Sequence, residues 1–146
     1  MEVAEKAKPI LLVEDEAIIR ESLRDWLTDV GYQVETAEDG EQALKTITER
    51  DFGLIILDLK LPGKDGLKVL QDARARRPQL KGVIITAYPS IETAVEAMKK
   101  GAVDYLSKPF DLDQLEEIIR ETLGPVQVEI RSEAALSVPV NCPVVL

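Results

Sequence analysis

Hydrophobic residues recur along the chain in two alternating patterns. Short runs of leucine and β-branched residues, typical of buried strands, are each followed by a polar turn and then by a stretch whose apolar positions keep the three- and four-residue spacing of a helix. This unit occurs five times. The runs predict strands at 10–13, 32–36, 53–57, 83–85 and 103–106, and the amphipathic stretches predict helices at 16–30, 41–50, 67–76, 91–100 and 111–123.

The ends of these helices carry recognisable signals. Gly31 and Gly101 follow helical stretches and are plausible stops, because glycine readily takes the left-handed conformation that ends a helix. Ser90 can cap the fourth helix, and Asp111 with Gln114 has the spacing of a capping box for the fifth. Within the fourth helix, four residues have the spacing of a face that lies mostly in the core: Ile91, Ala94, Val95 and Met98. Any apolar surface left uncovered there could serve dimerisation.

Strands that alternate with helices predict a parallel sheet, because a parallel connection needs a crossover of about this length. We therefore expect an α/β fold: a doubly wound, flavodoxin-like five-stranded parallel sheet with helices on both faces. The usual strand order for such a sheet is 2-1-3-4-5, with the ligand at the carboxyl ends of strands 1 and 3. Residues 9–123 would form this domain, residues 1–8 an N-terminal extension, and the proline-containing residues 124–146 a linker or flexible tail.

The amino-acid composition limits the classes of binding partner and the cellular setting that are expected for this chain. The formal net charge of −9 argues against direct binding of nucleic acid or of anionic membranes, and favours cations or basic partners. Cys142 is the only cysteine, so no internal disulfide can form and a reducing, cytoplasmic setting is expected. No segment has the apolar length of a secretory signal or of a membrane span.

Chemically distinctive residues follow the strands at the predicted ligand edge. Glu14 and Asp15 follow the first strand and Asp58 the third, which would gather three carboxylates at one point. Their repulsion is relieved by a raised pKa or by a hard cation with oxygen ligands, most plausibly Mg²⁺. Lys108, after the fifth strand, supplies a positive charge, and Thr86 ends the fourth. Such a set suits holding a metal and a phosphoryl group together.

A plainer interpretation exists for each residue taken singly. An acid before a helix often only complements the helix N-terminus, and Asp39 and Asp65, which precede glycines, are interpreted as turn residues. Tyr105 alone could be a half-buried strand aromatic, and Trp26 has the spacing of a core residue. Three acids and a lysine at the ends of strands favour a site instead.

In this order and spacing, several motifs resemble the receiver domain of two-component response regulators: Val13-Glu14-Asp15-Glu16, Leu57-Asp58-Leu59 with Pro62-Gly63 and Asp65-Gly66, Thr86-Ala87, and Tyr105-Leu106-Ser107-Lys108-Pro109-Phe110. The resemblance runs from about Ile10 to Leu123. The Thr86-Ala87-Tyr88 run, the helix through Glu92-Thr93-Ala94 and the segment 101–105 are similar to the subgroup attached to nitrogen-regulator-type transcription activators.

The resemblance implies a role for each matched residue. Asp58 would accept a phosphoryl group from a sensor histidine kinase. Four groups would hold Mg²⁺: Glu14, Asp15, Asp58 and the backbone carbonyl of Lys60. Lys108 would pair with a phosphate oxygen, and the peptide bond between Lys108 and Pro109 would be cis.

A change of state would follow phosphorylation. The Thr86 hydroxyl would move to the phosphoryl group and Tyr105 would turn inward, switching the surface formed by helix 4, strand 5 and helix 5. That surface would control a phosphorylation-dependent homodimer, or an effector domain or partner protein absent from this chain. Lys60 and Tyr88 match positions that tune hydrolysis in the family. Because neither carries a carboxylate or amide to orient water, we expect slow self-dephosphorylation.

Two other function classes compete. A metal-dependent small-molecule phosphatase or phosphotransferase would usually carry a second acid two residues after the first, where this chain has Lys60. A flavin or nucleotide binder would need a glycine-rich phosphate loop after the first strand, where Glu14-Asp15-Glu16 stands instead. The sequence therefore favours a phosphorylation-switched signalling module, which is not an enzyme acting on an outside substrate.

Overall fold

The computed structural model describes residues 8–124, in which five parallel strands form one sheet. The strand order is β2-β1-β3-β6-β7, which is the predicted order 2-1-3-4-5 because β6 and β7 are the fourth and fifth strands of this sheet. The strands are β1 (Ile10–Val13), β2 (Val34–Ala37), β3 (Leu54–Asp58), β6 (Lys81–Thr86) and β7 (Ala102–Ser107).

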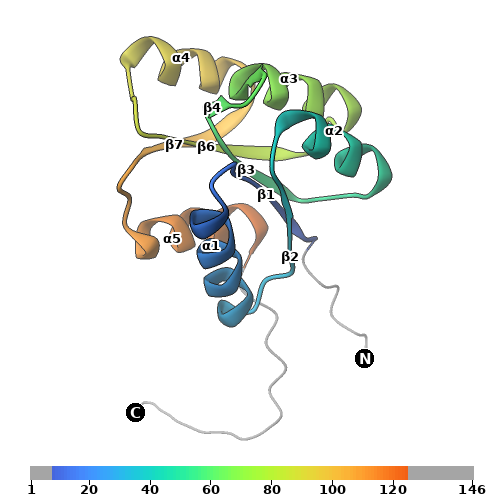
Figure 1. Ribbon diagram of the computed structural model, residues 1–146, viewed down its shortest axis with the longest axis vertical. Coiled ribbons are helices and arrows are strands. Elements are labelled where there is room, and N and C mark those ends of the chain that lie inside the picture. The colour runs from blue at the N-terminus through green and yellow to red at the C-terminus, as the bar shows by residue number, and fades with distance from the viewer. Residues whose placement is uncertain (1–7, 125–146) are drawn as a thin grey trace, which may run out of the picture.

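Helices cover both faces of the sheet (Figure 1). On one face lie α1 (Ala17–Val30) and α5 (Leu112–Leu123); on the other lie α2 (Gly40–Glu49), α3 (Gly66–Arg76) and α4 (Ile91–Lys99). None of the helices within residues 8–124 has both the length and the apolar composition needed to cross a membrane. The doubly wound α/β architecture expected from the sequence is confirmed.

The sheet separates two hydrophobic layers. In β1, Leu11 and Val13 pack into the layer under α2 and α3, whereas Ile10 and Leu12 pack into the layer under α1 and α5. Successive side chains of a strand point to opposite faces, so a strand covered on both sides must be apolar at every position. This explains the continuous hydrophobic runs of β1 and β3, whose residues 10–13 and 54–57 are all buried.

The predicted helix signals act locally as expected. Gly31 ends α1 with a φ of 123°, and its N–H bonds the carbonyls of Leu27 and Thr28. Ser90 caps α4 by accepting the Thr93 N–H. Asp111 caps α5, but its side chain accepts the Asp113 N–H rather than the Gln114 N–H that the predicted capping box requires. The predicted extension at 1–8 and tail at 124–146 lie almost entirely outside the described residues.

Two segments differ from expectation. The loop expected around Pro62–Gly66 contains an antiparallel pair of short strands, β4 (Lys60–Leu61) and β5 (Lys64–Asp65), because Gly63 takes a φ of 73° and reverses the chain. β2 begins at Val34 rather than at position 32, although the Tyr32 side chain still packs into the layer with α1 and α5.

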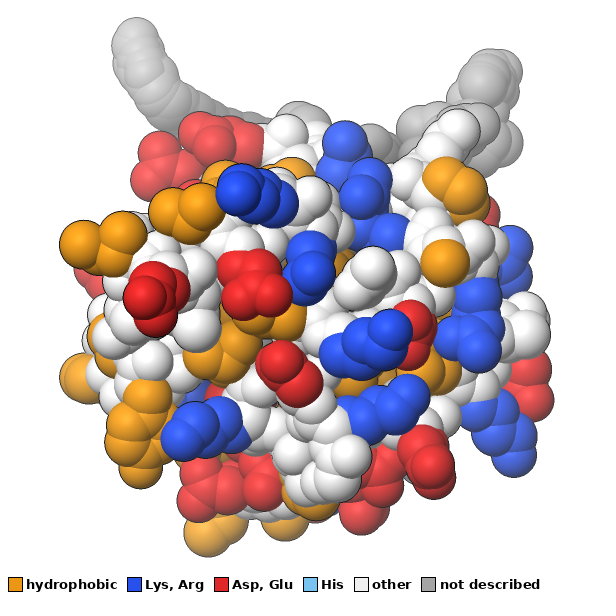
Figure 2. All heavy atoms as spheres, turned by 90° about the horizontal axis from the view of Figure 1, so that it is seen from above, with side chains coloured by type: hydrophobic (Ala, Val, Ile, Leu, Met, Phe, Trp, Pro, Cys, Tyr) orange, Lys and Arg blue, Asp and Glu red, His pale blue; other side chains and the backbone are white. Residues whose placement is uncertain are grey.

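The predicted core face of α4 was wrong. Ile91 is 83% exposed, and Val95 and Met98 are about half exposed, whereas Ala97 is fully buried. The helix lies over β7 at the edge of the sheet, so only a narrow stripe of its surface is covered. Viewed from the side of α2, α3 and α4, hydrophobic side chains gather along the left margin, where α4 lies, and basic side chains toward the centre and right (Figure 2).

Candidate functional site

The three predicted carboxylates meet at the carboxyl edge of the sheet. Glu14 follows β1 directly, Asp15 follows it, and Asp58 is the last residue of β3. Each offers a carboxylate oxygen within 4.8 Å of the others. Glu14 is buried at 3% exposure while Asp15 is exposed, so the cluster opens to solvent on one side. The parallel pairing of Val13 with Leu57 brings the two strand ends together.

Lys108 supplies the cation of the cluster from beyond β7. Its Nζ donates hydrogen bonds to Asp58 Oδ2 at 2.8 Å and to Glu14 Oε1 at 3.2 Å. The Lys108–Pro109 peptide bond is cis, as predicted, and the Lys108 N–H bonds the Thr86 carbonyl at 2.7 Å. The backbone therefore ties the lysine to the neighbouring strand end.

Burial and charge act against each other on the two most enclosed groups. Burial raises the pKa of Glu14, and the nearby Lys108 ammonium only partly offsets this. Burial alone would lower the pKa of Lys108, but its hydrogen bond to Asp58 and the charge of Glu14 outweigh it and raise that pKa. The site therefore favours the charged form of Lys108, and its three carboxylates outnumber this single ammonium.

The donor set fits a hard divalent cation. Three carboxylates with an open side offer oxygen ligands and leave room for retained waters, which is the environment Mg²⁺ prefers. Lys60 follows in β4, and its N–H donates to Asp58 Oδ1 at 3.1 Å, which orients the carboxylate. Glu14, Asp15 and Asp58 would hold the ion here.

Thr86 and Tyr105 lie near this edge but are not joined to each other by a hydrogen bond. Thr86 is fully buried at the end of β6, where its hydroxyl accepts the Tyr88 N–H at 2.9 Å. The Tyr105 hydroxyl instead accepts the N–H of Ser90 at 3.2 Å and shares a hydrogen bond with the Thr93 hydroxyl. The tyrosine is thus fastened to the first turn of α4, a contact that the sequence did not predict.

Lys60 and Tyr88, which follow Asp58 and Thr86 by two residues, contact each other. The Lys60 ammonium lies 4.3 Å from the centroid of the Tyr88 ring, within the range of a cation–π contact. The backbone N–H of Lys60 is bonded to Asp58 and that of Tyr88 to Thr86. The pair therefore links the loops after β3 and β6.

The supporting roles of two residues, Arg20 and Gly66, were not predicted from the sequence. Arg20 donates from Nη1 to the Glu14 carbonyl at 2.9 Å. Gly66 approaches the backbone of the β3 end so closely that an added Cβ would lie 2.3 Å from the Asp58 carbonyl oxygen. The spacing of Arg20 one turn into the helix after the acidic pair was a signal for the first, whereas the close approach at Gly66 is a tertiary contact that no local pattern reveals.

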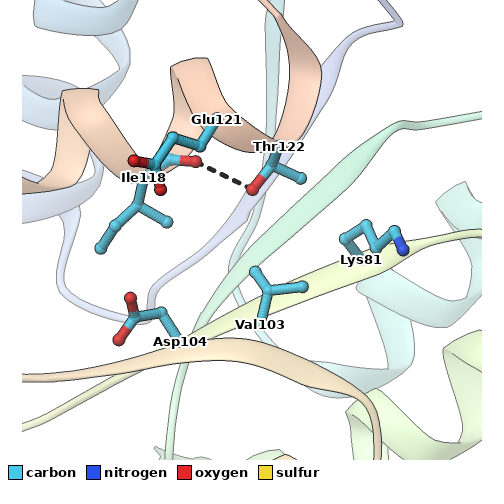
Figure 3. Close-up of a pocket in the computed structure, with 6 residues that line it drawn as sticks. All are labelled: Lys81, Val103, Asp104, Ile118, Glu121 and Thr122. Carbon is cyan, nitrogen blue, oxygen red and sulfur yellow. Dashed lines mark hydrogen bonds between the residues drawn. The ribbon is translucent and has the colours of Figure 1, made fainter.

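A hollow elsewhere on the surface is not part of this site. It encloses about 350 Å³ between α5 and the β6–β7 edge (Figure 3). Asp104 on its wall accepts the N–H of Tyr105 at 2.8 Å, and Thr122 donates to the Ile118 carbonyl at 2.8 Å, so both polar groups have partners. None of the predicted site residues lines it.

Comparison with known proteins identifies similar chains. The model of the family described as response regulator receiver domain matches residues 10–120. The alginate biosynthesis transcriptional regulatory protein AlgB of Pseudomonas aeruginosa is 43% identical over 131 residues, which are 90% of this chain and 29% of AlgB. The chain thus spans less than a third of that curated relative's length.

Solved structures agree with the fold. A response regulator protein from Burkholderia pseudomallei, solved with a phosphorylated aspartic acid, calcium ion and citrate, is 33% identical with a TM-score of 0.71, covering 80% of this chain and 66% of that one. The beryllofluoride-activated NtrC4 receiver domain dimer is 35% identical with a TM-score of 0.75, covering 79% of this chain and 95% of that one.

Proposed function

We propose that this chain, which belongs to the response regulator receiver domain family, accepts a phosphoryl group on Asp58 from a sensor histidine kinase. The observation that carries the assignment is the contact of Lys108 with Asp58 at 2.8 Å inside a cluster of three carboxylates. Asp58 is the acid that both ends a strand of the sheet and contacts the lysine. The solved relative with a phosphorylated aspartic acid supports the chemistry.

Each residue then has one task in the transfer. A carboxylate oxygen of Asp58 attacks phosphorus, forming a P–O bond while the P–N bond to the kinase histidine breaks and the electron pair stays on the imidazole. Lys108 leaves its carboxylate partners to pair with a phosphoryl oxygen. Glu14, Asp15, Asp58 and the Lys60 carbonyl would hold Mg²⁺, which would supply positive charge to the site.

The switch would run through Thr86 and Tyr105. In the state described, the Thr86 hydroxyl accepts from Tyr88, and Tyr105 is bonded to Ser90 and Thr93. A phosphoryl oxygen would attract the Thr86 hydroxyl, and Tyr105 would then turn inward, releasing the first turn of α4. Phosphate would favour that second packing because only that packing offers it the Thr86 donor.

The output surface would be the face of α4, β7 and α5. Ile91, Val95 and Met98 leave an apolar patch on α4, and a phosphorylation-dependent homodimer would cover it. The solved dimer of the NtrC4 receiver domain supports this. Because the chain spans 29% of AlgB, we infer that transcription control by an effector region elsewhere in a longer protein is the alternative output.

Hydrolysis of the aspartyl phosphate would be slow. The side chains of Lys60 and Tyr88 carry no carboxylate or amide to orient an attacking water, and they are engaged with each other in a cation–π contact. Family membership and the single cysteine, Cys142, support a cytoplasmic location. No observation favours the alternative of a small-molecule phosphatase.

Intact-mass analysis after incubation with acetyl phosphate and Mg²⁺ tests the proposal. We expect one added phosphoryl group that is lost in acid, persists for many minutes, and is absent in Asp58→Asn. Asp65→Asn is the matched control, because Asp65 only caps α3 and should leave phosphorylation intact. An unchanged wild-type mass with acetyl phosphate and with several kinases would contradict the assignment, and a lifetime of seconds would contradict slow hydrolysis. Sizing the beryllofluoride-treated protein tests the dimer.

A further inference from the structure

The loop that carries the acidic pair is held in place by a buried guanidinium. Arg20 lies in the first turns of α1, and its side chain is only 12% exposed. Its Nη1 donates to the Glu14 carbonyl at 2.9 Å and more weakly to the Asp15 carbonyl at 3.5 Å. Its Nη2 lies 3.8 Å from Glu38 Oε2 in the loop after β2. One side chain thus joins the loops after β1 and β2.

The Glu14 carbonyl has a structural need for this donor. The Glu14 N–H still belongs to the sheet, because it bonds the Ala37 carbonyl at 3.1 Å. The carbonyl of the same residue lies past the last paired residue of β1 and is turned to Arg20. A buried carbonyl without a donor is costly, so the guanidinium selects one orientation of this peptide plane.

That orientation bears on where the ligands point. The peptide plane between Glu14 and Asp15 determines the direction in which the Asp15 side chain leaves the backbone. On the other side, the Glu16 N–H donates to Glu14 Oε2 at 3.3 Å, so the loop is held at both ends of the pair. A planar fork suits this task because it can reach two carbonyls and a carboxylate, whereas an ammonium acts as a point charge.

We propose that Arg20 is a positioning residue for the metal site: it holds the Glu14–Asp15 loop in the geometry that binds Mg²⁺, although it touches neither the metal nor the phosphoryl group. The inference rests on the proposed function, since it presupposes that these carboxylates bind the ion. Residues that support metal ligands in this way typically change metal affinity tenfold or more when removed.

Magnesium affinity of the full chain, measured by calorimetric titration, is the first test. We expect Arg20→Met to weaken Mg²⁺ binding by about tenfold. The Mg²⁺ affinity of Arg20→Lys should lie between those of Arg20→Met and wild type. Arg24→Met is the matched control, because Arg24 lies one turn further along α1 and its ion pair with Asp25 is exposed. It should bind Mg²⁺ as wild type does.

Amide hydrogen exchange without metal separates positioning from loss of folding. Exchange at Asp15 and Glu16 should quicken in Arg20→Met, while amides of β3 should exchange as in wild type. If Arg20→Met keeps the wild-type Mg²⁺ affinity, or if β3 exchanges faster to the same extent as the loop, positioning by Arg20 is refuted while the proposed function stands. If wild type itself binds no Mg²⁺, the proposed metal site and this inference both fail.

Discussion

Replacing Lys108 by methionine should destabilise the metal-free protein and make it depend on Mg²⁺. The variant keeps the length of the side chain but leaves Asp58 and Glu14 without their shared cation. At an effective dielectric constant of 20, the attraction of Lys108 to Asp58 at 2.8 Å is about 6 kcal/mol, and its attraction to Glu14 at 3.2 Å is about 5 kcal/mol. Desolvation of the ammonium cancels several kcal/mol of this.

The net loss follows from how little solvent reaches the three groups. The side chains are 19% exposed for Lys108, 12% for Asp58 and 4% for Glu14, so solvent screens their contacts only weakly. Removing one partner of such a buried pair costs about 3 kcal/mol. With a urea dependence of about 2 kcal/mol per molar, the unfolding midpoint in EDTA should fall by roughly 1.5 M.

Added Mg²⁺ should restore much of the loss, because the cation takes over the neutralisation of the carboxylates. At a hundred times its dissociation constant it contributes about 2.7 kcal/mol. The assay is urea unfolding followed by circular dichroism, in EDTA and in Mg²⁺, with Lys45→Met as control since Lys45 is exposed on α2. A loss in EDTA within the ~0.2–1 kcal/mol of ordinary surface pairs would refute the reasoning.

Three further outcomes are expected. Glu14→Gln should stabilise the metal-free protein at pH 7, because the folded pKa of Glu14 is raised above 4.5 and charging this carboxyl costs stability as pH rises from 4.5 through the folded pKa. In urea unfolding, the gain in stability over wild type should be near zero at pH 4 and grow with pH. A gain independent of pH would contradict this. Gly66→Ala should lower the free energy of unfolding by about 2 kcal/mol and slow phosphorylation of Asp58 by acetyl phosphate, because the added Cβ would collide with the Asp58 carbonyl oxygen. An unchanged rate and stability would show that the backbone shifts to accept the Cβ at no cost. Tyr32→Phe should raise the free energy of unfolding by about 1 kcal/mol, because the buried hydroxyl has no hydrogen-bond partner among the described residues; a loss of that size would mean that the hydroxyl is bonded in solution.

The outcomes expected for the Lys108 and Glu14 variants share one physical cause, which is the tension between stability and charge at the ligand edge. Glu14 is a buried acid with a raised pKa, and it is kept beside two other acids rather than replaced by a neutral residue. Lys108 relieves that repulsion in the metal-free state. A site that binds a cation and a phosphoryl group needs the charge that weakens the fold around it.

Local patterns were enough for the fold and for the members of the site. Strand and helix periods predicted the five-stranded parallel sheet, and its strand order was expected because it is the usual order for such a sheet. The same topology implied that Glu14, Asp15, Asp58 and Lys108 would meet, and they do. Their roles in phosphoryl transfer remain proposals that rest on this geometry and on the family.

The sequence was wrong where coverage by a neighbour decides the outcome. A helical stripe in α4 predicted that Ile91, Val95 and Met98 are buried, but the position of that helix at the edge of the sheet leaves them exposed and buries Ala97 instead. Periodicity reports which residues share a face, whereas only packing reports whether anything lies against that face.

The acidic pair, Asp58 and Lys108 could therefore be found from sequence because the ends of parallel strands converge wherever such a sheet forms. The supports of the site could not. The fork of Arg20 on the Glu14 carbonyl, the bond of Tyr105 to Thr93 and the approach of Gly66 to Asp58 each join segments from different elements. Their existence depends on ångström distances between packed elements, which the chain acquires only when its tertiary structure is complete.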